Sequence, residues 1–210
     1  NVGGMQLFKI SSNDSSEKLL PKYANKISIL LNNIKKSNGI IIVYSRFLWA
    51  GIIPCAIALE HIGYSRYGVK NNILNNGKER DKKLNYAILT TPVDDLMGNE
   101  SYSFDKLIQD INHNNNKNGE NIKVVLITQK ASEGISFFNV REIHILDPWY
   151  HVNRLEQIVG RGIRRCSHIR LPLENRNTMI YNYCGYIEDM VSKDVFTLKT
   201  AGEKVKNVNE

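Results

Sequence analysis

The chain has 210 residues, of which 42% are hydrophobic and 23% charged, and a net charge of +7. This is enough chain for one large domain with a buried core, and the composition is that of an ordinary globular protein. No apolar run in the sequence is long enough to span a bilayer, and we expect no signal peptide. Three cysteines without a CxxC pair argue against a disulfide or zinc framework.

The same properties suggest where the protein works. Sparse cysteines favour a reducing, intracellular compartment. The positive charge suggests a polyanionic partner, although many basic proteins bind none. The chain begins at Asn1 without an initiator methionine, so we interpret it as a piece of a longer protein.

The first elements of the chain alternate between helix and strand. Apolar residues at helical spacing predict a helix that begins near Pro21 and ends at the turn formed by 38–39. Residues 40–44 (IIIVY) are a short β-branched run, which is typical of a buried parallel strand. Residues 48–62 predict a largely buried helix that begins or kinks at Pro54, because proline breaks a helix interior.

Polar segments interrupt this alternation in the middle of the chain. Residues 66–83 are polar and basic and predict a loop. Residues 85–91 predict a second strand, and 103–111 predict a short amphipathic helix. The asparagine-dominated run 112–121 predicts a mobile surface loop.

The second half of the chain predicts three more strands and one regular helix. The strands span residues 122–128, 142–146 and 178–184, and the helix spans residues 155–165. Residues 189–195 have a helical pattern as well. Strands that alternate with helices indicate one α/β domain, an open parallel sheet with helices on both faces. We place this domain at 15–198, between a linker or edge segment (1–14) and a polar tail (199–210).

The predicted helix 155–165 (LEQIVGRGIRR) has two contrasting faces. Its apolar face comprises Leu155, Ile158, Val159, Gly162 and Ile163. On the opposite side, Gln157, Arg161 and Arg164 fall within an arc of roughly 60°. A solvated charged face is the common alternative, but neither arginine has an acidic residue at i±4. This favours an anion from outside the helix, and the guanidinium fork suits phosphate oxygens.

Polar residues also follow the ends of the predicted strands. They are Ser45 and Arg46, Thr90 and Thr91, Thr128 to Lys130, and Asp147. In a parallel sheet these ends line up on one edge, where ligands bind. Hydroxyls, amides and a lysine along such an edge suit the phosphate backbone of a polyanion. The alternative is that strand ends are simply where polar residues occur.

The segment 128–136 (TQKASEGIS) leads from a buried strand into a loop. Gly134 allows a positive φ or a close approach of backbone to a ligand, and Ser136 can bond to a sugar or phosphate oxygen. The sequence contains no P-loop, dinucleotide-binding fingerprint, nucleophile elbow or zinc-protease motif. It also shows no complete catalytic constellation and no metal site.

These motifs together resemble those of superfamily 2 helicases. ITQKASEGIS followed by EIHILDPWYHVNRLEQIVGRGIRR is similar to motifs V and VI. The motif VI pattern QxxGRxxR is matched by Gln157, Gly160, Arg161 and Arg164. The strand that ends in Ser45 resembles motif IV, and order and spacing agree over residues 40–168. YSRF, LDPWYHVNRLEQIVGR and RRCSH are most similar to the branch in poxviruses and related large cytoplasmic DNA viruses, which includes the early transcription factor small subunit and nucleoside triphosphate phosphohydrolase I.

The resemblance implies the C-terminal RecA-like domain of a two-domain, ATP-hydrolysing motor. ATP and Mg²⁺ would sit mainly in the P-loop of a missing N-terminal RecA-like domain, so the 210-residue piece alone should not hydrolyse ATP. Arg161 and Arg164 would act as arginine fingers on the γ-phosphoryl group, and Gln157 would connect the nucleotide to the domain interface. The residues implied on the nucleotide side are Gly134, Ser136 and Gly160, and those implied at the nucleic-acid backbone are Ser45, Arg46, Thr91, Thr128 and Lys130.

The implied partners are DNA or RNA, the N-terminal domain and viral transcription machinery, with no membrane, and the implied locations are the virion and the host cytoplasm. Two features depart from the family. Ser136 stands where many relatives carry aspartate, and the polar stretch 67–83 resembles a lineage-specific insertion. Two other classes stay open: a nucleic-acid-binding or assembly module without motor activity, and the nucleotide-sugar half of a transferase. The transferase needs an acidic ribose ligand, which the sequence does not offer.

Overall fold

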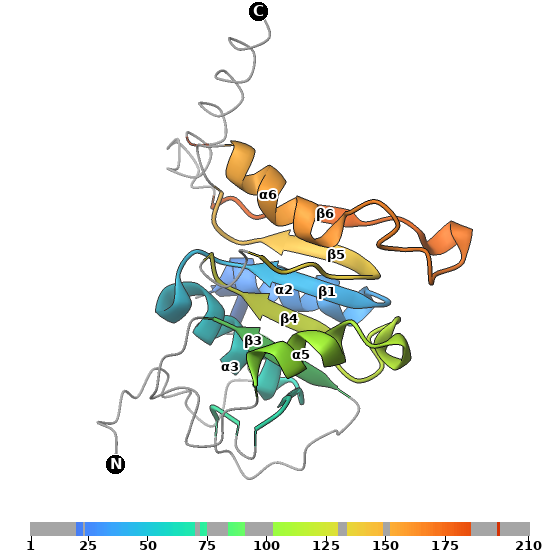
Figure 1. Cartoon of the computed structure of the whole chain (residues 1–210). Helices are drawn as coiled ribbons and strands as arrows, with labels where there is room; N and C mark the ends of the chain where they lie inside the picture. Colours follow the sequence, from blue (N-terminus) through green and yellow to red (C-terminus); the bar gives the residue numbers. More distant parts are fainter. Residues whose placement is uncertain are drawn as a thin grey trace, which may run out of the picture.

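A six-stranded, wholly parallel sheet forms the centre of the molecule (Figure 1). The computed structural model describes residues 20–22, 24–69, 72–74, 84–90, 103–129, 134–148, 152–185 and 197. The strand order is β2-β3-β4-β1-β5-β6. The strands are β1 (Ile40–Tyr44), β2 (Ser65–Arg66), β3 (Asn85–Leu89), β4 (Val124–Ile127), β5 (Val140–Ile145) and β6 (Met179–Asn182).

The central strands are those that the sequence predicted most directly. Every residue of β1 and β4 is buried, because helices cover both faces of the sheet at these positions. The edge strands differ. β6 lies within the predicted strand 178–184, at one edge of the sheet. Unlike the residues of β1 and β4, its Met179 and Ile180 are 58% and 40% exposed. β2 was not predicted, since a strand of two residues has no readable periodicity.

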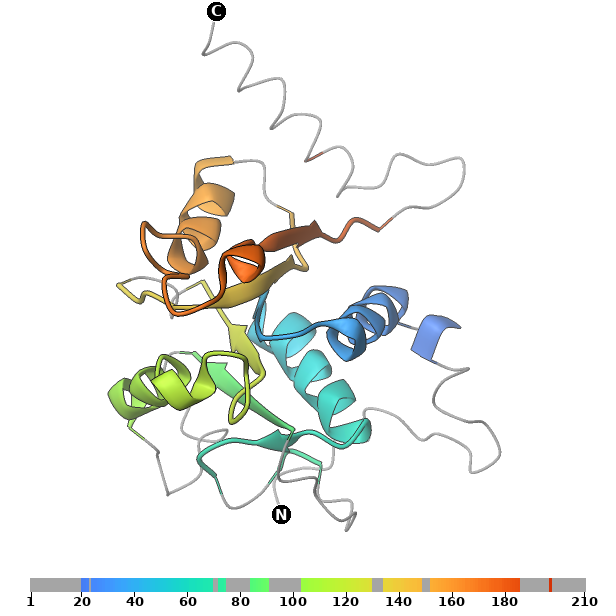
Figure 2. The same ribbon diagram turned by 90° about the vertical axis from the view of Figure 1, so that its right-hand side faces the viewer.

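Among the described residues, the helices that cover the sheet include α2 (Asn25–Lys36), α3 (Ile53–His61), α5 (Phe104–Ile111) and α6 (Val152–Gly162). Figure 2 shows α2 and α3 on one face and α5 and α6 on the other. Two hydrophobic clusters match these two layers, one centred on Leu30, Ile34 and Leu59 and the other on Leu107, Ile111 and Ile158. The expected open parallel sheet with helices on both faces is confirmed.

The predicted break at Pro54 is confirmed as a change of helix type. Leu48–Ile52 form a π-helix, η1, which α3 continues from Ile53. The N–H of Ile52 bonds to the carbonyl of Phe47, five residues back, at 3.0 Å. Proline lacks an N–H and crowds the carbonyl four residues before it, so the wider turn relieves a clash that an α-helix would have here.

The asparagine-rich segment 112–121, predicted as a mobile surface loop, is a mostly exposed loop that contains one short 3-10 turn, η2 (Asn114–Asn116). Asn116 is fully buried within it. Its Nδ2 donates to the carbonyls of Ile111 and Ile122 at 2.9 and 3.2 Å, and its Oδ1 accepts from the N–H groups of Asn121 and Ile122 at 2.9 and 2.8 Å. One side-chain amide thus satisfies four backbone groups and fixes the loop between α5 and β4.

Several predicted segments lie outside the described residues: the linker 1–14, the helix at 189–195 and the polar tail 199–210. Among the helices that the structure does describe, none is both long and apolar enough to cross a membrane.

Candidate functional site

Arg161 lies beside the segment that leads from β4 to β5. Gln157 and Arg161 are one turn apart on α6, as predicted; Gln157 is exposed and Arg161 half-buried. The Arg161 guanidinium donates to the carbonyl of Ile135 at 3.5 Å, and the N–H of Phe137 donates to the Arg161 carbonyl at 2.9 Å. The fold therefore brings Arg161 next to Ile135. Its two neighbours in the chain, Gly134 and Ser136, are positions that the resemblance implied on the nucleotide side.

Gly134 and Ser136 have different surroundings. Gly134 is exposed and has φ +81°, which confirms the expected left-handed conformation. The carbonyl of Ser136 accepts from Nδ2 of Asn112 at 2.9 Å, and Oδ1 of Asn112 accepts from the N–H of Phe138 at 2.9 Å. Asn112 thus holds this segment against the end of α5. Sequence reasoning missed it because it is the first residue of an asparagine run.

Arg164 is not on the helix that carries Arg161, which corrects the expected common face. α6 ends at Gly162, Arg164 is exposed beyond it, and Ile163 is 41% exposed rather than buried. Hydrogen bonds to residues near the start of β5 direct the chain away from the axis of α6 after Gly162. The Ser167 carbonyl accepts from the N–H of Asn139 at 3.0 Å, and Nε2 of His168 lies 2.7 Å from the Val140 carbonyl.

The arginines of this region have no carboxylate partner in the described part of the chain: none lies within ion-pairing distance of Arg161 or Arg164. Two cationic groups without a counter-charge among the described residues can accept an anion at no cost in ion pairs broken there. A group of three or more histidine, cysteine, aspartate or glutamate side chains that could hold a metal ion is also not found among the described residues.

The carboxyl ends of four strands form one row. The register pairs Tyr44 with both Ile127 and Ile145, and Ile127 with Leu89. The next residues along these strands are therefore neighbours: Thr90, Thr128, Ser45 and Leu146. Oγ1 of Thr128 donates to Oγ1 of Thr90 at 3.2 Å, and both threonines are buried. Thr91 and Lys130, also predicted here, lie outside the described residues.

Asp147 organises the end of β1. Its Oδ2 accepts from the Ser45 hydroxyl at 2.5 Å and from the N–H of Arg46 at 3.0 Å. Ser45 is fully buried, so its hydroxyl faces protein and not solvent. The geometry gives Ser45 a positioning part in place of the direct phosphate contact implied by the sequence. The sequence predicted Asp147 just after the strand 142–146, but the residues that it contacts, Ser45 and Arg46, follow a different strand, β1.

Arg46 is half-buried and its guanidinium carbon lies 4.5 Å from the centre of the Phe47 ring. Next along the chain, η1 packs directly on Ser45: a Cβ added at Gly51 would overlap the Ser45 hydroxyl. Glycine is therefore required at position 51 for this close approach.

Two glycines of α6 offer a matched pair of variants. A Cβ at Gly160 would meet no other described residue within 4 Å, whereas a Cβ at Gly162 would lie 3.1 Å from Cδ1 of Ile143 and 3.4 Å from Cβ of Val140. We expect Gly160→Ala to raise the free energy of unfolding by about 0.5–1 kcal/mol, because alanine favours a helix interior. We expect Gly162→Ala to lower it by about 1–3 kcal/mol through overpacking against β5. Urea unfolding measures both, and equal stabilisation by the two variants would contradict the close packing of α6 on β5.

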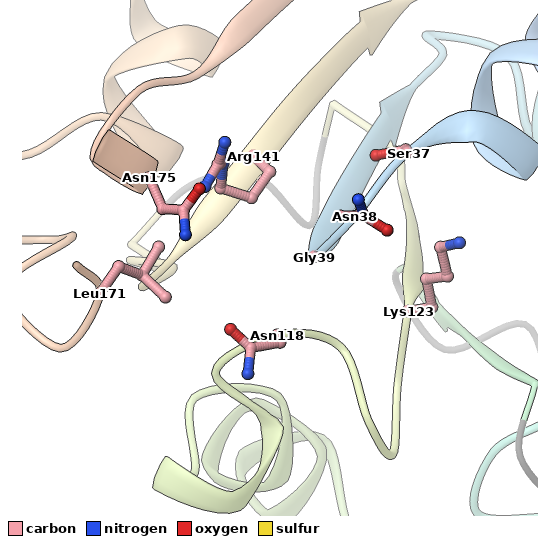
Figure 3. A pocket seen from close by; sticks show the side chains of 8 residues that line it. All are labelled: Ser37, Asn38, Gly39, Asn118, Lys123, Arg141, Leu171 and Asn175. Atoms are coloured by element: carbon pink, nitrogen blue, oxygen red, sulfur yellow. The ribbon is translucent and has the colours of Figure 1, made fainter. Parts of the chain in front are cut away.

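A pocket of about 390 Å³ opens at the opposite, amino edge of the sheet (Figure 3). It is lined by Ser37, Asn38, Gly39, Asn118, Lys123, Arg141, Leu171 and Asn175. Burial lowers the pKa of Lys123, although the Glu142 carboxylate opposes this. Arg141 donates through Nη2 to Oδ1 of Asn177 at 2.8 Å. No predicted site residue lines the pocket, so it is separate from the arginine site.

Comparison with known proteins gives a consistent set of viral relatives. The chain is 32% identical over 170 residues to a protein of Acanthamoeba polyphaga mimivirus that is named "Putative ATP-dependent RNA helicase R563", a match that covers 80% of this chain. It is 39% identical over 102 residues, 49% of this chain, to nucleoside triphosphatase I of Heliothis armigera entomopoxvirus. It is 27% identical over 205 residues, 88% of this chain, to the termination factor NPH-I homolog of African swine fever virus.

The chain spans only 27%, 16% and 29% of the lengths of these three proteins. No protein-family model matches the chain. The relatives agree with the group of proteins that the sequence motifs resembled.

Proposed function

We propose, from the premise that this chain is a relative of the viral superfamily 2 helicases, that it is the C-terminal RecA-like half of an ATP-dependent nucleic-acid helicase or translocase. The N-terminal RecA-like domain of the same protein would bind ATP and Mg²⁺ in its P-loop. This chain would complete the nucleotide site from the other side of the cleft. We favour a role of the whole protein in viral transcription.

The observation that carries the proposal is the pairing of Arg161 with the Gly134–Ser136 segment. Arg161 is held against Ile135 by a hydrogen bond, and no described carboxylate neutralises it. A half-buried guanidinium of this kind fits a phosphate group. Bound ATP supplies the γ-phosphoryl group that is transferred to water.

Each residue of the site has a part in this proposal. Arg161 and Arg164 stabilise negative charge on the transferring phosphoryl group, a contribution of about 10³–10⁵ in rate in other NTPases. Gln157, one turn before Arg161, links the nucleotide to the domain interface. Gly160 has no side chain and no described neighbour above it, so it leaves room for the nucleotide.

The carboxyl edge of the sheet would carry the nucleic-acid strand. Arg46, which is half-buried, offers the guanidinium donors that phosphate oxygens accept, next to the buried hydroxyls of Thr90 and Thr128. Asp147 fixes the backbone of Arg46 through a hydrogen bond and so sets its direction. Thr91 and Lys130 stay predictions of the same contact.

The test is ATP hydrolysis by the full-length protein, with and without single-stranded DNA and RNA. We expect nucleic acid to stimulate turnover, and the stronger activator identifies the strand on which the motor acts. The 210-residue chain alone is expected to show no turnover above background. Hydrolysis by this chain alone, or full-length turnover that ignores nucleic acid, would favour a different activity or a binding module.

A further inference from the structure

Two aromatic side chains are exposed at the carboxyl end of β1. Phe47 is 45% exposed and Trp49 is 63% exposed, and they follow Ser45 and Arg46 directly in the chain. Large aromatic residues usually bury most of their surface, because each contributes 150–250 Å² of area. Exposure of two such residues within three positions is therefore a feature that packing of this domain does not explain.

The backbone holds this pair outward. Phe47 caps η1, and its carbonyl accepts from the N–H of Ile52 in the wide turn. On the inner side of the same turn, Gly51 packs against the Ser45 hydroxyl and Ile52 is fully buried. Because the inner side of η1 is fixed by these two residues, Trp49 is carried on the side that faces solvent. Short π-helical turns are found frequently at functional sites.

The chemistry around the pair is cationic. The Arg46 guanidinium lies over the Phe47 ring, with 4.5 Å between its carbon and the ring centre. The Arg46 backbone is tied to Asp147, and the Thr90, Thr128 and Ser45 row adjoins it in the sheet. An aromatic surface next to a cation offers a stacking face for a nucleobase and a charge for the phosphate that follows it.

We propose that Phe47 and Trp49 form a stacking platform for unpaired nucleobases, with Trp49 as the main contact. This rests on the proposed function and deepens it, because it assigns base contacts, not only phosphate contacts, to the edge of the sheet. Every base has a π-face, so the platform selects single strands over duplexes without selecting a sequence. The occupant is an unpaired base of a DNA or RNA strand that runs across the end of β1.

Intrinsic fluorescence of this chain provides the test. The chain has two tryptophans, Trp49 and Trp149, so the variant Trp149→Phe leaves Trp49 as the only tryptophan reporter. Fluorescein-labelled oligothymidylate and oligouridylate are titrated by anisotropy, and unlabelled strands by tryptophan emission. We expect the strand that binds to quench Trp49, and Trp49→Ala to weaken its binding about 5- to 150-fold, the range of one lost stacking contact.

Three controls separate stacking from a general loss of surface. Trp49→Phe keeps an aromatic face and should retain most of the affinity. Ile169→Ala removes an apolar side chain of equal exposure, 63%, from the turn after α6 and should have no effect. An oligonucleotide with abasic sugars should bind the wild type as weakly as thymidylate binds Trp49→Ala, and the two losses should not add, because they remove the same contact.

The outcomes are distinct. Undiminished binding by Trp49→Ala with unquenched Trp49 emission overturns the platform and leaves the proposed function intact. Absence of any oligonucleotide binding by the wild type overturns the platform together with the nucleic-acid part of the proposed function. Non-additive losses and quenching support the platform.

Discussion

Replacement of Arg161 by alanine in the full-length protein is expected to lower kcat for ATP hydrolysis by about 10³–10⁵-fold. The expected KM for ATP changes little, because the charge that Arg161 would stabilise develops only in the transition state. The measurement is steady-state ATP hydrolysis with a saturating single-stranded activator, together with a separate nucleotide-binding titration.

Lysine at position 161 separates charge from geometry. Arg161→Lys keeps the positive charge but loses the planar fork that donates to two oxygens at once, so we expect only a small part of the activity to return. Arg161 also donates to the Ile135 carbonyl, so urea unfolding of both variants must accompany the kinetics. A loss of turnover with unchanged unfolding assigns the effect to chemistry.

Arg165 provides the matched control for this experiment. It is an exposed arginine four residues from Arg161 and lies outside the QxxGRxxR pattern. We expect Arg165→Ala to change kcat by less than about threefold, because an exposed charge contributes little. Normal hydrolysis by Arg161→Ala would contradict the arginine-finger assignment and favour a nucleic-acid-binding or assembly module.

The part of the fold that could be predicted is the part with local signals. Residues 40–43 are all β-branched and Tyr44 is aromatic, and such a short apolar run is typical of a strand buried on both faces. Pro54 marks its own helix break. The end of α6 carries no such signal. It is set by contacts of Ser167 and His168 with Asn139 and Val140, about thirty residues away in the chain.

In the candidate site too, features set within one helix could be predicted, whereas features set by distant contacts could not. The helical period correctly placed Gln157 and Arg161 one turn apart, since that relation lies within one helix. The burial of Ser45 depends on Asp147, which is 102 positions later in the sequence. Asn112 similarly acts on Ser136 and Phe138 across 24 and 26 positions. Such pairings arise from the register of the sheet, which composition and periodicity do not encode.

Glu60 is the second position where we expect a large effect, in this case on folding. It lies on α3 and is only 5% exposed. Its carboxylate accepts from the N–H of Ile73 at 2.9 Å, from the N–H of Leu74 at 2.6 Å and from the Tyr86 hydroxyl at 2.5 Å. Burial, together with the charge of Glu60, raises the pKa of Tyr86, so this hydroxyl stays a donor at all ordinary pH values.

Glu60→Leu has similar volume but no acceptor, and it leaves three donors without a partner. Because each such group costs about 1–3 kcal/mol when buried, we expect the free energy of unfolding to fall by at least about 3 kcal/mol. The midpoint of urea unfolding reports this loss. Glu60→Gln keeps one acceptor oxygen, so its free energy of unfolding should lie between those of the wild type and Glu60→Leu. Tyr86→Phe removes one donor only, so Glu60→Leu should cost less in that background than in the wild type. A loss below about 1 kcal/mol for Glu60→Leu would mean that water replaces the carboxylate, and that residues 72–74 are held to α3 by their apolar contacts alone.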